Sequence, residues 1–333
     1  MKELQEMENQ RRLFEILKEK IPPKYTVAQT VSNLLKISIE SAQRRVNCKQ
    51  ELTMSEFTKI SKEYKISVDA IIYEGSNQSI VFKYSPIELD NADDYMKYIE
   101  KISEILIYFK KKYNEIEFTY TAQDIPVYHF YKFPELGFFR LYIWYNIKAK
   151  NKKTFKEFYE NLDKEKILNI YKSLNKTIEN IPAKEIWTEH TIDNTLSLFE
   201  FYYDAGVFIT KVEALIILEQ LKSLVNEIEQ IAEKGYKENT DKTPFYLYNC
   251  STAMESNLSL IKCNNKYYSH IKLFTVNLLE TENDILCTEI KSWIDSIISK
   301  SILISGDGAL KERIQFFNTA KTKIQKMIEK VNI

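Results

Sequence analysis

The stretch from Thr26 to Asn47, "TVAQTVSNLLKISIESAQRRVN", decides how the first part of this chain folds. Its first half has apolar residues at helical spacing, which places them on one face: Val27, Val31, Leu34 and Leu35. Thr26 stands where a helix N-cap is wanted, and Ser38 can cap a second short helix that turns Ala42 and Val46 inward. The stretch therefore predicts two short helices joined by a tight turn.

The second of these helices presents an outward face of polar side chains. When the helix is projected at 100° per residue, Arg44 points away from Ala42. The residues that share or border its face are Glu40, Ser41, Gln43 and Asn47. Arginine can donate two hydrogen bonds to guanine, and glutamine or asparagine can pair with adenine in the major groove. We therefore expect these five residues to read bases.

Basic residues gather around the same helix. Lysine plus arginine and aspartate plus glutamate each number 47 in the 333 residues, so the whole chain has no net charge. Between Lys36 and Lys49, by contrast, four basic residues face the single acidic residue Glu40. Such a local patch suits attraction to phosphates. We assign the phosphate contacts to Thr26, Lys36, Ser38, Arg45 and Lys49.

Further short helices surround this pair. Residues 3–20 show helical spacing, Thr53 and Glu56 have the spacing of a capping box, and one more short helix precedes residue 75. Residues 26–72 resemble the λ-repressor-like helix-turn-helix domain, with "TVAQTVSNLL" as the first helix of the motif, "KIS" as the turn and "IESAQRRVN" as the recognition helix. The resemblance implies a bundle whose recognition helix enters the major groove of DNA. The sequence departs from the common pattern at Lys36, where the family usually has glycine.

The remainder of the chain reads mostly as helices. "SIVFKYSPIEL" suggests a short strand, and an amphipathic helix follows in "NADDYMKYIEKISEILIYFKKKYNE". Residues 116–145 are the most aromatic segment and predict a largely buried helix, with an apolar character for any effector pocket. Three more helices are expected at 163–180, 189–204 and 210–234. The whole chain is also similar to a group of uncharacterised bacterial proteins that join such a head to a long helical, aromatic-rich region.

The pattern changes after residue 242. Strands are expected at 245–249, 257–262 and 266–274, with helices at 284–299 and 309–331. The expected fold class is therefore mainly α. We divide the chain into a helix-turn-helix bundle (1–75), a linker and helical dimerisation or sensor region (76–242), and a small α+β unit for ligand sensing (243–333).

Catalytic and metal-binding patterns are weak. The four cysteines have no CxxC spacing, and His129, His190 and His270 lie far apart and outside known motifs. We expect no enzyme activity, no cofactor and no metal. The chain has no signal peptide and no long apolar run, which favours a cytoplasmic protein without membrane contact.

These patterns together predict a one-component transcription regulator. Its expected partners are double-stranded DNA, a second copy of the chain in a homodimer, and a small-molecule or peptide effector. An alternative is a protein or peptide interaction module that uses a degenerate helix-turn-helix head. A third hypothesis, an enzyme in the C-terminal half, would be favoured by a pocket that joins His270 or His190 to a carboxylate.

Overall fold

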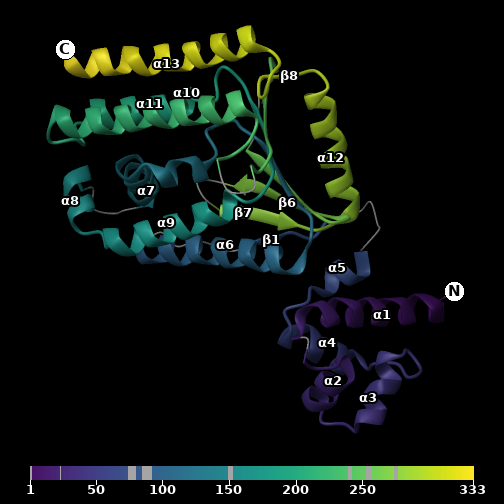
Figure 1. The fold of residues 1–333 in the computed structure, drawn as a ribbon. Coiled ribbons are helices and arrows are strands. Elements are labelled where there is room, and N and C mark those ends of the chain that lie inside the picture. The colour runs from purple at the N-terminus through teal and green to yellow at the C-terminus, as the bar shows by residue number, and fades with distance from the viewer. Residues whose placement is uncertain are drawn as a thin grey trace. The chain divides into compact units, whose positions relative to one another are not determined.

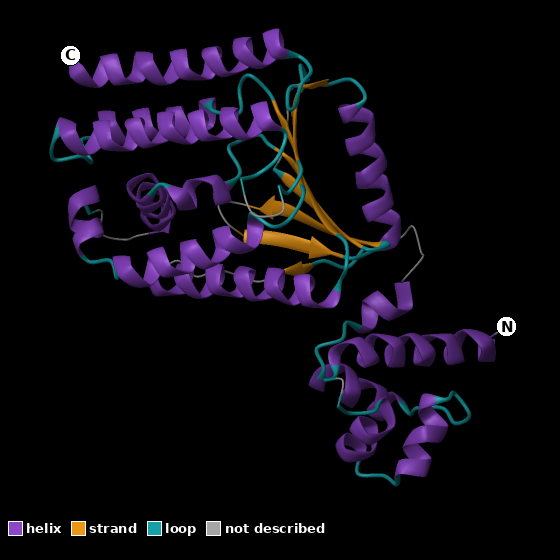
Figure 2. Cartoon of the chain, in the orientation of Figure 1, coloured by secondary structure: helices purple, strands orange, loops and turns teal. Residues whose placement is uncertain are grey.

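The computed structural model describes residues 2–22, 24–73, 80–84, 92–148, 153–238, 242–252, 257–273 and 277–333. The chain forms two compact units, Met1–Phe82 and Lys83–Ile333. Figure 1 shows the path of the chain, and Figure 2 shows that the strands all belong to the second unit. Each unit is described by itself below.

The first unit is a small bundle of short helices. They are α1 (Lys2–Lys20), α2 (Val27–Leu35), α3 (Ile39–Val46), α4 (Met54–Glu63) and α5 (Val68–Tyr73). The side chains that fill its core come from all five helices and the loops between them: Leu13, Phe14, Leu17, Val31, Ala42, Ile60, Ile66 and Ile71. Because Thr26, Ser38 and Thr53 each accept a backbone N–H as N-caps, the predicted helix starts are confirmed.

The second unit is built on a mixed sheet. Among the described residues, eight strands join it in the order β1-β7-β6-β5-β2-β3-β4-β8. The strands are β1 (Lys83–Tyr84), β2 (Ile116–Thr121), β3 (Ala183–Trp187), β4 (Phe245–Asn249), β5 (Leu258–Cys263), β6 (Lys266–Leu273), β7 (Asn277–Thr281) and β8 (Ile302–Leu303). β3 lies parallel to both β2 and β4, and the other neighbours are antiparallel.

Helices cover both faces of this sheet, as Figure 1 shows. One face carries α12 (Asp284–Ile298), which packs on Ile186, Leu258 and Leu260. The helices associated with the opposite face and its large core are α6 (Ala92–Lys112), the 3₁₀ helix η1 (Val127–Lys132), α7 (Pro134–Lys148), α8 (Phe155–Glu160), α9 (Lys164–Ile178), α10 (Asp193–Asp204), α11 (Lys211–Lys234) and α13 (Leu310–Asn332). The aromatic segment contributes α7 to this core, with Phe138, Phe139 and Tyr142 almost fully buried.

The expected fold class, mainly α with a small C-terminal α+β unit, was wrong. β2 and β3 come from the region that was expected to be helical, and they lie in one sheet with β4 and β5 from the expected C-terminal unit. The reason is that β3 is short and carries Glu185 at its centre, so it lacks the apolar run that marks a buried strand. β2 is rich in aromatic residues and was assigned to the aromatic segment instead.

The longer elements of the second unit were predicted well. The strands expected at 245–249, 257–262 and 266–274 correspond to β4, β5 and β6, and the five helices expected between 163 and 331 correspond to α9 to α13. In "SIVFKYSPIEL" the structure describes residues 80–84, of which Lys83–Tyr84 form a strand; residues 79 and 85–89 lie outside the described part of the chain.

Candidate nucleic-acid interface

The turn between α2 and α3 is held by local hydrogen bonds. Lys36 adopts the left-handed conformation, with φ 58° and ψ 46°, where the resembled family has glycine. The Ser32 hydroxyl donates to the Ile37 carbonyl at 2.7 Å, and the Ser32 carbonyl accepts the Ile37 N–H at 3.2 Å. Ser32 therefore fixes the turn from the preceding helix, and α3 starts directly afterwards at its Ser38 cap.

Four of the five expected base-reading residues form an exposed face on α3. Glu40, Gln43, Arg44 and Asn47 are all exposed, and Nε2 of Gln43 donates to Oδ1 of Asn47 at 3.0 Å. Ser41 differs, because its side chain is half-buried and its hydroxyl accepts a hydrogen bond from Arg45 at 2.7 Å. The structure thus places together the side chains that can donate to and accept from base edges.

The residues expected to contact phosphate divide into three groups. Lys36 and Lys49 are exposed at the two ends of α3. Thr26 and Ser38 are also exposed, but their hydroxyls accept helix N–H groups as caps. Arg45 is only 8% exposed and points into the bundle. The prediction that Arg45 contacts phosphate is therefore not supported by its position, because its guanidinium lies away from the exposed face of α3.

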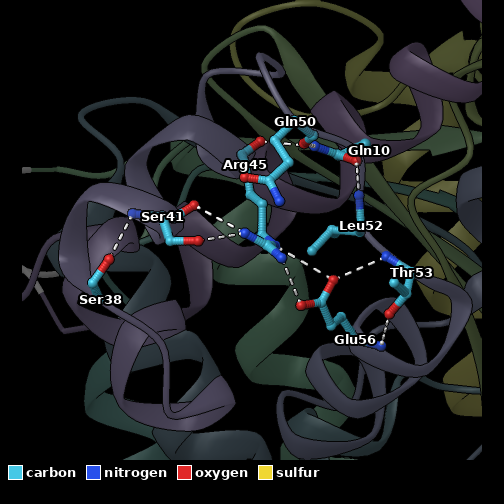
Figure 3. A network of polar contacts seen from close by, with 8 residues as sticks. All are labelled: Gln10, Ser38, Ser41, Arg45, Gln50, Leu52, Thr53 and Glu56. Carbon is cyan, nitrogen blue, oxygen red and sulfur yellow. Dashed lines mark hydrogen bonds and ion pairs between the residues drawn. The ribbon is translucent and has the colours of Figure 1, made fainter.

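Arg45 holds α3 against α4, as Figure 3 shows. Its Nη2 donates to Oε1 of Glu56 at 3.0 Å and its Nε to Oε2 of the same carboxylate at 3.3 Å. Its Nη1 bonds the hydroxyl and the carbonyl of Ser41. The same Glu56 carboxylate accepts the backbone N–H of Thr53 at 2.9 Å, so it closes the capping box of α4 as well.

Gln10 of α1 secures the loop that follows α3. Its Nε2 donates to the carbonyls of Arg45 and Gln50, at 2.8 and 2.9 Å, and its Oε1 accepts the N–H of Leu52 at 2.7 Å (Figure 3). Gln10 is 4% exposed, so this amide replaces water for three buried or half-buried backbone groups. This role has no signal in the sequence, because a single polar residue on an amphipathic helix gives no sign of a partner 35 residues away.

The electrostatics of the Arg45 pair favour an ionised Glu56. Partial burial raises the pKa of Glu56. The hydrogen bonds from Thr53 and the charge and hydrogen bonds of Arg45 lower it by a larger amount, so the pKa lies below its usual value. The pair is therefore charged at neutral pH and serves to orient α3.

The three histidines lie in different settings of the second unit. Nε2 of His129 is 2.9 Å from the buried Glu185 carboxylate, and Nδ1 of the exposed His190 is 2.9 Å from Asp193. Nε2 of His270 is 3.8 Å from Glu280, which is beyond hydrogen-bond distance. Within the described ranges, no group of three or more His, Cys, Asp or Glu side chains is arranged to hold a metal ion.

No described helix is long and apolar enough to cross a membrane. Comparison of the chain with protein-family models, with curated proteins and with solved structures gave no match.

Proposed function

We propose that the chain is a sequence-specific DNA-binding transcriptional regulator of the one-component type. Met1–Phe82 acts as a λ-repressor-like head that places α3 in the major groove, and Lys83–Ile333 provides effector binding or dimerisation. The proposal assigns the chain a binding role in the cytoplasm, with no catalytic step and no cofactor.

The exposed polar face of α3 is the observation that carries this proposal. Gln43, Arg44 and Asn47 lie within two turns of one another, and Glu40 borders them at the start of the helix. Ala42 and Arg45 on the other side anchor the helix, so the outward side chains stand on a rigid support. Lys36 and Lys49 flank the face where phosphates would run.

Selection from random DNA duplexes with the full-length protein tests the proposal. We expect one preferred site, and we expect Arg44→Ala to bind that site about 5- to 150-fold more weakly, since one good arginine–guanine contact contributes about 1–3 kcal/mol. Binding to a scrambled duplex should change little. Arg11→Ala removes the same charge from an exposed position on α1 and serves as the matched control. The proposal would be contradicted if no DNA site were selected, or if Arg44→Ala and Arg11→Ala lost the same amount of affinity for the selected site.

A homodimer follows from the size of the head. One small head makes few phosphate contacts, whereas two heads can bind half-sites that are one helical turn, or about 34 Å, apart. Gel filtration should therefore give twice the 39.4 kDa mass of one chain, and the selected site should be palindromic.

A protein or peptide interaction module is the second candidate. Several large apolar side chains are exposed on the head, among them Ile39, at the start of α3, which is 51% exposed, and Met54, at the start of α4, which is 78% exposed. Exposed apolar side chains contribute to a protein contact where they form a continuous patch. This candidate predicts that no duplex is selected at low salt, and that Ile39→Lys, rather than Arg44→Ala, abolishes the function of the head.

A further inference from the structure

Lys83–Ile333 encloses an apolar cavity of about 260 Å³. It lies between the face of the sheet formed by β2, β5, β6 and β7 and the helices α6, α7 and α9. Apolar side chains that line it include Ile99, Ile102, Ile105, Tyr128, Trp144 and Leu174. A cavity of about 150 Å³ lined by apolar groups already accommodates benzene. This cavity therefore has room for a ring or chain with a polar head.

One wall of the cavity carries a buried arginine with unused hydrogen-bond donors. Arg140 of α7 is 5% exposed, and its Nη2 is paired with the Asp124 carboxylate. Its Nε and Nη1 have no partner among the described residues. The Thr195 hydroxyl, at 2.7 Å, and the Ile125 N–H, at 2.9 Å, hold Asp124 in place. The guanidinium is thus fixed by its counter-ion and still lacks two acceptors, which is costly for a buried group.

A lysine reaches the same region from the sheet. Lys272 of β6 lines the cavity, and its amine makes no hydrogen bond or ion pair within the described ranges. Burial, reinforced by the nearby Arg140 charge and opposed by Asp124, lowers the pKa of Lys272 to about 8. The amine is therefore still mostly protonated at neutral pH. The Asp124 carboxylate is ion-paired with Arg140, so the nearby Lys272 ammonium has no anionic partner of its own among the described residues.

The register of the sheet adds a row of polar side chains beside these cations. His270 lies directly opposite Ser259 of β5 on one side and Glu280 of β7 on the other, and all three line the cavity. Burial lowers the pKa of His270, so the ring is neutral, and its Nδ1 has no partner among the described residues. His270 and the Glu280 carboxylate therefore share one cavity, which is the arrangement that would favour the hypothesis of an enzyme in this half of the chain, with 3.8 Å between His270 Nε2 and Glu280.

We propose that this cavity binds a small amphipathic carboxylate, whose anionic head is held by Arg140 and Lys272 and whose apolar tail or ring fills the space beside α6 and Trp144. The carboxylate gives the Lys272 ammonium the anionic partner that it lacks within the described ranges, next to the Arg140 guanidinium that lines the same cavity. This inference deepens the sensing role proposed for Lys83–Ile333 and rests on that role only for its regulatory meaning.

Octanoate is a suitable probe, with octanamide as its uncharged match. Binding to the full-length protein, without DNA, is measured by calorimetry and by intrinsic tryptophan fluorescence, to which Trp144 in the cavity wall contributes. We expect octanoate to bind and to raise the thermal unfolding temperature. Octanamide should bind at least about tenfold more weakly, since a charge-assisted contact contributes about 1.5–3 kcal/mol. Inorganic phosphate should also bind more weakly than octanoate, because it has no apolar tail to fill the cavity.

Lys272→Met tests the site of the ligand carboxylate, because methionine keeps the apolar stem of lysine and removes its charge. Octanoate affinity should fall about tenfold or more, while octanamide affinity stays the same. The variant should remain folded, since it removes an unpaired buried ammonium group. Lys262→Met on β5 is the control, because Lys262 does not line the cavity.

Three outcomes would overturn the inference. They are no binding of octanoate, equal binding of octanoate and octanamide, and binding of phosphate as tight as that of octanoate. Because the assay contains no DNA, its failure is distinct from failure of the DNA-binding proposal.

Discussion

Two adjacent arginines have opposite surroundings in this protein. Arg44 is exposed on the outer face of α3, whereas the Arg45 guanidinium is buried against Glu56 and Ser41. On a helical projection Arg45 lies near the boundary of the outer face, and neither its spacing nor its charge indicates on which side the long side chain ends. The partner that decides this, Glu56, lies 11 residues away on the next helix.

Arg45→Ala should destabilise the first unit by about 1–3 kcal/mol, because it removes hydrogen bonds to a carboxylate and to Ser41 and leaves their acceptors half-buried. Arg44→Ala is the control and should change stability by less than about 0.5 kcal/mol. Amide hydrogen exchange in α3 and α4 of the full chain measures both effects, since the three tryptophans all lie in the second unit. Equal protection in the two variants would show that the Arg45 pair contributes nothing.

At the scale of elements, the N-terminus of α4 is also the attachment point of α3. The Glu56 carboxylate accepts the Thr53 N–H within its own helix and binds Arg45 from the other. The capping-box spacing was visible in the sequence and predicted the start of α4 correctly, because a capping box is made by residues three positions apart. The contact with α3 has no such local signal.

The lowered pKa of Glu56 predicts an acid dependence of this attachment. Because the pKa in the folded state lies below that in the unfolded chain, the stabilisation is fully present above about pH 5 and is lost as pH falls through the folded-state pKa. Glu56→Gln should therefore lower the protection of α3 and α4 at pH 7 and flatten its decline between about pH 5 and 3. Hydrogen exchange across this range measures the effect. Glu51→Gln, at an exposed position in the preceding loop, should retain the wild-type decline.

At the scale of the whole molecule, the sheet joins segments that are far apart in sequence. β3 lies between β2 and β4, and β2 also pairs with β5. Parallel neighbours need long crossovers, which here are formed by the helices between residues 127 and 234. The region that was expected to be a helical sensor therefore supplies the centre of the sheet.

A fragment of residues 243–333 should consequently fail to fold. It would lack β2 and β3, so β4 and β5 would each lose a neighbouring strand and the apolar surface of the sheet would be exposed. A fragment of residues 80–333 retains every strand and serves as the control. Circular dichroism during thermal unfolding distinguishes the two fragments. A cooperative transition in the shorter one would show that its strands form an independent unit.

The sequence by itself determined the local features of this protein. Helix caps, the turn after α2, the polar face of α3 and most of the longer helices and strands depend on residues within a few positions of one another, so their patterns are readable along the chain. The inward turn of Arg45, the roles of Gln10 and Glu56, the mixed sheet and the cavity with Arg140 and Lys272 were decided only by the tertiary structure. Each of these depends on strand register or on a packing partner tens of residues away, and burial of a charge becomes visible only when that partner is in place.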